Sequence, residues 1–224
     1  MSAEQCFKAL LTAFKGQVNS CSNWIEDEQQ ITKIKQIAQE LTRRTKRNSI
    51  ILQGIPGSGK TNMLLALKAF IWHSNINDYR KSRDTGRNER LYLYTWNARD
   101  IVSIYLSDKK AYKELVNHSL LGIDDLGLEL ENIKQYGNDY YPIAELIYKR
   151  YELGLPIFLS TNLPFRARED NMLSIESVYG SRIASRLNEV AKRLTFSFTD
   201  YRNLSKEELW LCKLSVSRRN DNCF

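Results

Sequence analysis

The chain has 224 residues, of which 42% are apolar and 26% are charged. This composition excludes a fibrous or extensively disordered chain and indicates a globular protein that is long enough to bury a core. Lysine and arginine outnumber aspartate and glutamate by 33 to 26, and the net charge of +7 favours an anionic partner such as a nucleic acid or a nucleotide.

The sequence disfavours membrane, secreted and zinc-binding proteins. The longest apolar stretch, residues 63–72, contains Lys68 and is too short to cross a bilayer. The N-terminal residues lack the basic and apolar regions of a signal peptide, so we expect a cytoplasmic protein with no membrane partner. We expect reduced thiols and no zinc site, because the four cysteines are far apart and have no nearby histidine. His73 and His118 are expected to be structural or exposed.

Two helical patterns precede the first expected strand. The first lies in residues 1–23, a short helical appendage and candidate partner-binding segment, with apolar residues at helical spacing at Phe7, Leu10, Leu11 and Phe14. The second has the same spacing at Ile31, Ile34, Ile37 and Leu41 and is followed by the basic run 43–47. That run either contacts phosphate or is a solvated helix end whose cations face the helix dipole.

From residue 49 onward, short apolar runs alternate with helical patterns. This alternation predicts an α/β fold in which a parallel sheet is covered by helices on both faces. The expected strands are residues 49–52, 91–95, 119–123, 157–160 and 195–198. The expected helices are residues 62–72, residues around 181–192, and one that begins at Pro142 and is capped by Gly154. A helical region is expected at roughly residues 98–117. The polar residues 73–90 are expected to form a flexible surface insertion.

Residues 54–61 fit the complete phosphate-binding pattern G-x-x-x-x-G-K-[ST], between an expected strand and an expected helix. The glycines let backbone N–H groups turn toward phosphate oxygens, and the helix adds its positive N-terminus. Lys60 would reach the β- and γ-phosphates as a catalytic residue, and the Thr61 hydroxyl would ligate Mg²⁺. We therefore expect ATP and Mg²⁺ as cofactors. The expected nucleotide-binding residues are Gly54, Ile55, Pro56, Gly57, Ser58, Gly59, Lys60, Thr61 and Asn62.

A pair of aspartates follows the expected strand 119–123. Asp124 and Asp125 lie at the carboxyl end of this strand, where parallel sheets bind ligands. Asp124 would hold Mg²⁺ directly or through water, and Asp125 would orient or activate the attacking water. The alternative is that the two aspartates merely begin a turn before Gly127.

Asn162 follows the next expected strand, 157–160. If that strand lies between the strands of the two preceding motifs, Asn162 meets the γ-phosphate and the attacking water. Otherwise Asn162 is a turn residue before Pro164. The order of the strands separates these two interpretations.

These motifs, in this order, resemble the AAA+ ATPases of the DnaC-type bacterial helicase loaders and the related IstB-like transposition ATPases. The resemblance runs from about residue 45 to residue 202. It rests on GIPGSGKT (54–61), IDDLG (123–127), YGN (136–138), STN (160–162), YGSRIASRL (179–187) and TDYR (199–202). It implies a P-loop NTPase of the AAA+ type, with residues 24–202 as the ATPase core and residues 203–224 as a short tail.

The resemblance also implies roles that spacing alone does not show. Asn162 falls on the sensor-1 position, Arg186 on the arginine finger and Arg202 on the sensor-2 arginine. An arginine finger acts at the γ-phosphate of a neighbouring subunit, so the resemblance implies a homo-oligomer. Arg182 lies four residues before Arg186 on the same helical face and is the alternative finger.

The chain departs from this family in three places. Its appendage is much shorter than the N-terminal domain that often grips the helicase, and it lacks the zinc-binding cysteines of some members. Few residues follow Arg202, so we expect little or no separate lid domain. Asp125 stands where many AAA+ enzymes have glutamate, and because aspartate is one methylene shorter, we expect slow hydrolysis.

The resemblance implies a path for single-stranded DNA along a helical insertion after the second strand, here residues 98–117. Its lysines would track phosphates beside Tyr105 and Tyr112, whose rings would stack on bases. The alternative is that both tyrosines are buried and the lysines only solubilise the helix. These lysines are Lys109, Lys110 and Lys113.

Three functions follow from these expectations. The first is an ATP-dependent helicase loader in DNA replication, which assembles with a replicative hexameric helicase and single-stranded DNA and is switched by ATP hydrolysis. The second is an IstB-like transposition ATPase that binds duplex DNA and recruits a transposase. The third is a nucleotide-gated binding module with negligible turnover, which the aspartate at position 125 keeps open.

Overall fold

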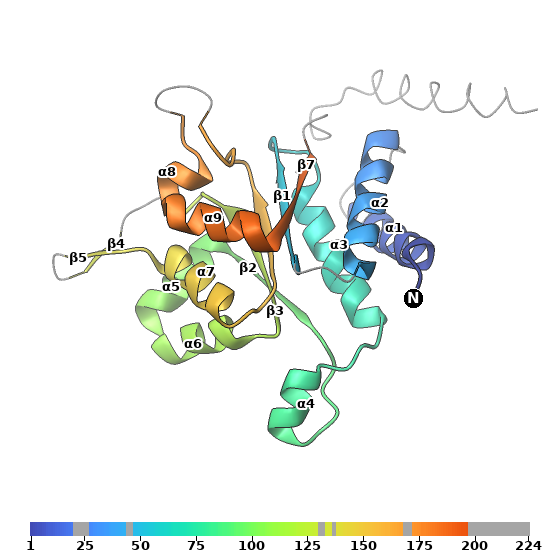
Figure 1. The fold of residues 1–224 in the computed structure, drawn as a ribbon, viewed down its shortest axis with the longest axis horizontal. Helices are drawn as coiled ribbons and strands as arrows, with labels where there is room; N and C mark the ends of the chain where they lie inside the picture. Colours follow the sequence, from blue (N-terminus) through green and yellow to red (C-terminus); the bar gives the residue numbers. More distant parts are fainter. Residues whose placement is uncertain (20–26, 44–46, 130–132, 136–137, 168–171, 197–224) are drawn as a thin grey trace, which may run out of the picture.

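The structure is a computed structural model that describes residues 1–19, 27–43, 47–129, 133–135, 138–167 and 172–196 (Figure 1). Several residues named from the sequence lie outside these ranges, as do three of the four cysteines. The residues named from the sequence that lie outside these ranges are 44–46, 136–137, 197–202, which include Arg202, and the tail 203–224. Among the described residues, no helix has both the length and the apolar composition that crossing a membrane requires.

A five-stranded parallel sheet forms the centre of the molecule, in the order β2-β3-β6-β1-β7. Its strands are β1 (Ser49–Gly54), β2 (Leu93–Asn97), β3 (Leu120–Leu126), β6 (Ile157–Thr161) and β7 (Ala191–Phe196). A separate antiparallel pair joins β4 (Ile133–Gln135) to β5 (Asn138–Tyr140). β6 lies between β1 and β3, which is the order that the interpretation of Asn162 as a ligand-facing residue requires.

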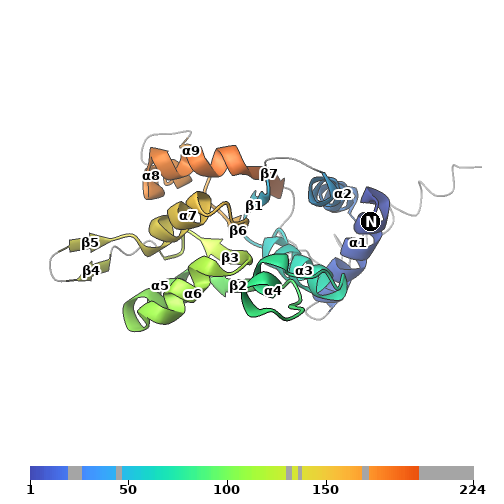
Figure 2. The ribbon, with the colours of Figure 1, turned by 60° about the horizontal axis from the view of Figure 1, so that its bottom comes forward.

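Helices cover both faces of this sheet, which confirms the predicted α/β fold (Figure 2). The strands are rich in buried apolar residues because neither face meets water. One face packs against α5 (Ala98–Ser107), α6 (Lys109–Asn117), α7 (Pro142–Glu152), α8 (Ile175–Tyr179) and α9 (Ser181–Val190). The other packs against α1 (Ala3–Asn19), α2 (Glu28–Thr42) and α3 (Lys60–His73).

The N-terminal helix α1 packs into the same apolar cluster as α2 and α3. Its side chains Cys6, Leu10 and Phe14 are at most 1% exposed. The Phe14 ring lies 3.6 Å from the position that a Cβ on Gly59 would occupy, next to the start of α3. The Cys6 thiol is free, and burial raises its pKa. The apolar face of α1 is therefore used inside the chain.

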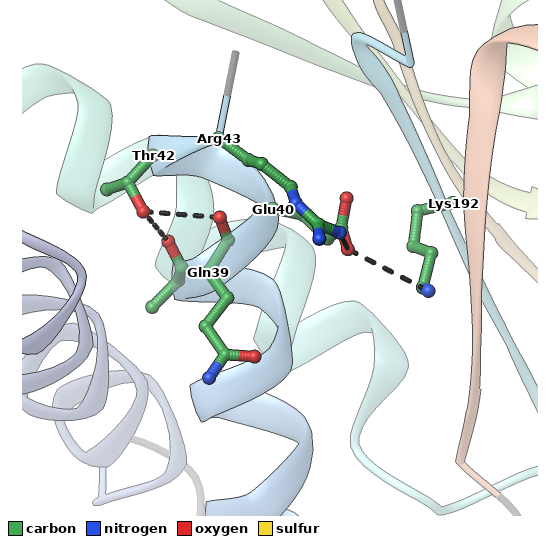
Figure 3. A network of polar contacts seen from close by, with 6 residues as sticks. Gln39, Glu40, Thr42, Arg43 and Lys192 are labelled. Atoms are coloured by element: carbon green, nitrogen blue, oxygen red, sulfur yellow. Dashed lines mark hydrogen bonds and ion pairs between the residues drawn. The ribbon is translucent and has the colours of Figure 1, made fainter. Parts of the chain in front are cut away.

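The end of α2 is tied to β7 by Glu40 (Figure 3). The Glu40 carboxylate lies 3.6 Å from the guanidinium of Arg43 and 3.7 Å from the ammonium of Lys192. The Thr42 hydroxyl donates to the carbonyl of Gln39 over 3.2 Å, within the last turn. Arg43 therefore belongs to a solvated helix end, which is one of the two interpretations of the basic run.

Residues 73–90, expected to form a flexible surface insertion, contain a helix that the sequence pattern does not predict, α4 (Tyr79–Thr85). Asp78 caps the start of α4 with its carboxylate, and Gly86 ends it in the left-handed conformation, with φ 67°. An isolated antiparallel bridge closes the base of the segment. No residue of α4 is buried, so the helix has no apolar face that a hydrophobic pattern would show.

The helical region expected at residues 98–117 is confirmed, and it consists of two helices, α5 and α6. Asp108 separates the two helices with an extended backbone, φ −142° and ψ 94°. Its carboxylate accepts hydrogen bonds from the backbone N–H groups of Lys110 and Ala111, each over 2.9 Å. An aspartate that caps a helix start competes with continuation of the preceding helix.

The last strand begins earlier than the expected residues 195–198. β7 starts at Ala191, which pairs with Ser49 of β1, and α9 ends at Val190 rather than at residue 192. Alanine, lysine and arginine at residues 191–193 favour a helix locally. Pairing with β1 and burial of Ala191 override this local preference.

His118 stacks on Tyr94, with ring centroids 3.7 Å apart and an angle of 4° between the ring planes. Burial, and then the charges of Lys81 and Arg150, lower the pKa of His118 to about 4. In the unfolded chain this pKa lies near 6.5, so between about pH 6.5 and pH 4 the unfolded state binds more protons. The free energy of unfolding is therefore expected to fall as the pH falls through this window.

Replacing His118 with phenylalanine keeps a stacked ring and removes the titrating group. We expect His118→Phe to lose less free energy of unfolding than the wild type between pH 7 and pH 4.5, measured by urea denaturation. His73→Phe, at an exposed position of α3, is the control and should follow the wild type. An equal loss in His118→Phe and the wild type would contradict this account.

Candidate nucleotide-binding site

The loop between β1 and α3 has the backbone that a phosphate-binding loop needs. Gly57 and Gly59 take left-handed conformations, with φ 77° and 88°, which other residues rarely adopt. Gly54 is needed for a different reason, because a Cβ there would lie 1.7 Å from the carbonyl oxygen of Phe196 in β7. The glycines therefore allow both the turn of the loop and the close approach of β1 to β7.

Lys60 begins α3 and lies inside this loop, with 5% of its surface exposed. Its ammonium donates to the carbonyl of Ile55 over 2.7 Å and lies 3.5 Å from the hydroxyl oxygen of Ser58. Gly59, at the N-cap, has no side chain to accept from the first N–H groups of α3. A cation and a helix N-terminus thus meet at one loop, an arrangement that binds phosphate.

The remaining loop residues lie around this centre. Ile55 and Pro56 are exposed at the loop, whereas Ser58 is buried and donates its hydroxyl proton to the Ile55 carbonyl over 2.8 Å. Asn62 is half-buried in the first turn of α3. The expected nucleotide-binding residues therefore form one continuous loop and helix start.

Thr61 and Asp124, the two expected magnesium ligands, lie in contact. The Thr61 hydroxyl donates to Asp124 Oδ1 over 3.1 Å. Hydroxyl and carboxylate oxygens suit Mg²⁺, which commonly binds to one or two protein ligands together with substrate phosphates. Within the described ranges, no group of three or more His, Cys, Asp or Glu residues could hold a metal ion. The residues present thus fit an ion shared with a nucleotide rather than a closed protein site.

Asp124 and Asp125 lie in a β-bulge of β3. Ile123, before the aspartates, pairs with Leu159, and Leu126, after them, pairs with Thr161. Between these pairs β3 has two residues where β6 has one. Asp125 has φ 55°, a left-handed conformation that aspartate adopts more readily than most residues. A turn does begin at Asp125, and the bulge before it places Asp124 against the phosphate-binding loop.

Ser160 of β6 joins the two aspartates, and no sequence pattern assigns it this role. Its hydroxyl donates to Asp124 Oδ1 and accepts from the backbone N–H of Asp125, the latter over 2.9 Å. Its side chain is fully buried. The only signal in the sequence is the position of Ser160 in the STN motif, two residues before Asn162.

Asn162 follows β6 and is exposed at the carboxyl edge of the sheet. The segment after it is held on two sides. Gln53 of β1 donates from Nε2 to the carbonyl of Leu163 over 2.9 Å, and the Thr161 hydroxyl donates to the carbonyl of Leu126 over 2.7 Å. These hydrogen bonds hold the ends of β1, β6 and β3 together beside Asn162, and Gln53 is a further residue that no motif identifies.

Glu129 connects the turn after Asp125 to α8, the helix that precedes the arginine-bearing helix α9. Its carboxylate accepts from the backbone N–H of Gly127 over 2.8 Å and from the hydroxyl of Tyr179. Burial, and then the charge of Glu129, raise the pKa of Tyr179, so its hydroxyl stays protonated and keeps donating. Tyr179 ends α8 just before α9 begins, which links the aspartate motif to the arginine helix.

The two candidate arginine fingers have different surroundings on α9. Arg182 is exposed in the first turn. Arg186 is half-buried, and its guanidinium lies 3.9 Å from the ring centroid of Tyr148 and 5.0 Å from that of Tyr151. Its Nη1 atom is buried without a hydrogen-bond partner. Arg186 therefore packs on α7 of its own chain, and a role at a neighbouring subunit would require it to leave these rings.

The tyrosines considered for base stacking are buried. Tyr105 is 7% and Tyr112 is 4% exposed, and their rings meet edge to face at 4.9 Å. Lys109 lies over the Tyr105 ring, with 3.1 Å between the ammonium nitrogen and the ring centroid, and Lys110 and Lys113 are exposed. This agrees with the alternative in which α5 and α6 offer cations to solvent and no stacking surface.

The fold of this chain is similar to that of three proteins of known structure. The DnaC helicase loader has a TM-score of 0.54 and 19% identity, with 77% of this chain and 92% of that chain covered. DnaI has a TM-score of 0.52 and 14% identity, with 83% and 92% covered. The replication initiator DnaA, bound to AMPPCP and single-stranded DNA, has a TM-score of 0.50 and 15% identity, with 90% and 64% covered.

No family model and no curated protein matches the sequence. The similarity to solved structures and the order of the strands nevertheless both indicate an α/β fold. This chain therefore has an α/β fold similar to that of the DnaC helicase loader.

Proposed function

We propose that this protein is an ATP-dependent helicase loader that acts in DNA replication. The observation that carries the proposal is the contact between Asp124 and Thr61, which is next in the chain to the buried Lys60. It joins a phosphate-binding loop to a carboxylate from a separate strand, as ATP with Mg²⁺ requires. The similarity in fold to the DnaC helicase loader supports the choice of protein class.

Binding and hydrolysis are divided among the residues of the site. Lys60 and the loop N–H groups bind the phosphates, and Thr61 and Asp124 hold Mg²⁺, which would neutralise charge on the phosphate oxygens. Asp125 orients the attacking water. Asn162 contacts the γ-phosphate from the end of β6.

Two arginines complete the proposed site. Arg186 acts in trans on the nucleotide of a neighbouring subunit, with Arg182 as the alternative, and Arg202 acts as the sensor-2 arginine. Positive charge at the γ-phosphate stabilises the charge that develops during transfer. Hydrolysis then depends on assembly, because no protomer supplies its own finger.

Slow turnover is part of this proposal. Asp125 is shorter than the glutamate of many AAA+ enzymes, and its backbone has φ 55°. The same feature favours a second candidate, a nucleotide-gated binding module with negligible turnover. In both functions the bound nucleotide determines which partner complex forms.

Single-stranded DNA is the second partner of the proposed loader. Because Tyr105 and Tyr112 are buried, bases would have to stack elsewhere. Trp72, at the end of α3, and Tyr79, in α4, are 44% and 81% exposed, and the guanidinium of Arg90 lies 4.7 Å from the Trp72 ring centroid. Aromatic rings beside cations suit a single strand, so we place the candidate stacking surface at the insertion.

Co-elution with the host's replicative hexameric helicase tests the proposal. We expect a complex on a sizing column with a non-hydrolysable ATP analogue, and a weaker complex with ADP. The Lys60→Ala variant should lose the dependence on nucleotide. Absence of a complex in every nucleotide state would contradict the loader and favour an IstB-like transposition ATPase, which filament assembly on duplex DNA would then test.

A further inference from the structure

We propose that Ser160 is the positioning residue of the magnesium site, which sets the directions of both Asp124 and Asp125. This inference rests on the proposed binding of ATP with Mg²⁺. It goes beyond that proposal because Ser160 lies in β6, outside the phosphate-binding loop and outside the aspartate motif. The proposed role of Ser160 is indirect: its buried side chain acts on the magnesium site only through the two aspartates.

The hydrogen-bonding capacity of Ser160 is used in one particular way. A hydroxyl has one proton to donate and lone pairs to accept. The backbone N–H of Asp125 can only donate, so the Ser160 oxygen accepts there, over 2.9 Å. The single proton of Ser160 is therefore free to go to the carboxylate of Asp124, which can only accept when ionised.

The bulge explains why a side chain is needed at this point. The register between β3 and β6 shifts between Ile123 and Leu126, the interval that contains Asp124 and Asp125. Ser160 supplies an acceptor for the backbone N–H of Asp125 in this interval. Removing the hydroxyl would take away this hydrogen bond at a fully buried position of β6, while Asp125 still has to keep φ 55°.

Asp124 receives hydroxyl donors from two different elements. Thr61 donates to Oδ1 from α3 over 3.1 Å, and Ser160 donates to the same oxygen from β6. Two donors from fixed elements hold the carboxylate in one orientation. Partners of this kind behind a metal ligand commonly change metal affinity or activity by 10- to 100-fold when they are removed.

The chain offers a matched control in the neighbouring residue. Thr161 is also fully buried in β6, and its hydroxyl also donates and accepts one hydrogen bond. Its partners are the carbonyl of Leu126 and the N–H of Leu163, and not an aspartate side chain. Thr161→Val thus removes a similar buried hydroxyl without releasing Asp124.

The test is a Mg²⁺ titration of the binding of a fluorescent ATP analogue to the full chain. We expect Ser160→Ala to raise the Mg²⁺ concentration for half-maximal binding by about 10- to 100-fold. Affinity for the analogue without Mg²⁺ should change by less than about 2-fold. Ser160→Thr, which keeps the hydroxyl, should restore the wild-type titration, and Thr161→Val should keep it. Circular dichroism checks that each variant is folded.

Each outcome of this titration has a separate meaning. If Ser160→Ala titrates as the wild type does, or if Thr161→Val shifts equally, the positioning role is wrong while the proposed function stands. If the wild type binds no nucleotide at any Mg²⁺ concentration, the proposed function fails together with this inference. A lower kcat in Ser160→Ala at saturating Mg²⁺, with KM unchanged, would support the part of the inference in which Ser160 positions Asp125.

Discussion

Replacing Lys60 with alanine is expected to weaken ATP binding by about 100-fold. The ammonium would donate charged hydrogen bonds to two phosphates, each contributing about 1.5 kcal/mol, and about 1.4 kcal/mol corresponds to a tenfold change in affinity. Lys60 is 5% exposed and lies against the Ile55 carbonyl, so its position is set by the loop itself. Titration of a fluorescent ATP analogue in the presence of Mg²⁺ measures the loss.

Asp125→Asn is the matched variant for this experiment. Asparagine keeps the backbone N–H that donates to Ser160 and tolerates φ 55° as aspartate does. It should therefore bind ATP with nearly the wild-type affinity and lose most of the ATPase rate. Equal ATP affinity in Lys60→Ala and the wild type would contradict a phosphate site at residues 54–61. An unchanged, very low rate in Asp125→Asn would favour the nucleotide-gated binding module.

Replacing Arg150 with methionine is expected to lower the free energy of unfolding by about 3 kcal/mol or more. Arg150 lies in α7 and is fully buried. Its Nη1 lies 2.9 Å from the carbonyl of Val116 and 2.7 Å from that of His118, and its Nη2 lies 2.6 Å from that of Pro156. Each buried carbonyl left without a donor costs about 1–3 kcal/mol. Urea denaturation at pH 7 measures the change.

Arg150 is charged under these conditions, because burial and the nearby Arg80 lower its pKa only to about 9. Arg80→Met is the control, since Arg80 donates to the carbonyl of Asn117 over 3.1 Å at an exposed position. That variant should lose less than about 1 kcal/mol. An equally small loss in Arg150→Met would mean that the cost of burying the cation balances its hydrogen bonds.

These two expected results concern different parts of the fold. Lys60 lies at the carboxyl edge of the sheet, in a contiguous motif of eight residues. Arg150 holds together the end of α6 and the segments that enter β3 and β6, at the opposite ends of these strands. The first variant should leave stability nearly unchanged, and the second should leave the nucleotide site intact wherever the chain remains folded.

The sequence alone determined the class of fold and the phosphate-binding loop. Residues 54–61 act through consecutive backbone groups, so the required glycines and Lys60 stand next to one another in the chain. Strands that are buried on both faces appear in the sequence as short apolar runs, and the helices between them appear as apolar residues at helical spacing. The sequence also predicts that Thr61 and Asp124 share a magnesium ion, because a P-loop needs a carboxylate from a neighbouring strand end.

Several boundaries of helices and strands depend on contacts that a hydrophobic pattern does not include. Asp108 separates α5 from α6, and Asp78 starts α4, through hydrogen bonds that a hydrophobic pattern does not register. Helix-favouring residues at 191–193 form strand because β1 is available to pair with them. Propensity is a weak preference, and tertiary contacts override it.

Only the tertiary structure decided the strand order, the burial of Tyr105 and the roles of Ser160 and Arg150. Each depends on a contact between residues far apart in the chain. Ser160 meets Asp124 across a strand pair with a bulge, and Arg150 meets carbonyls of other elements. Such hydrogen bonds have no period and no fixed spacing in the sequence, so no sequence pattern predicts them. Folding alone brings these partners within reach.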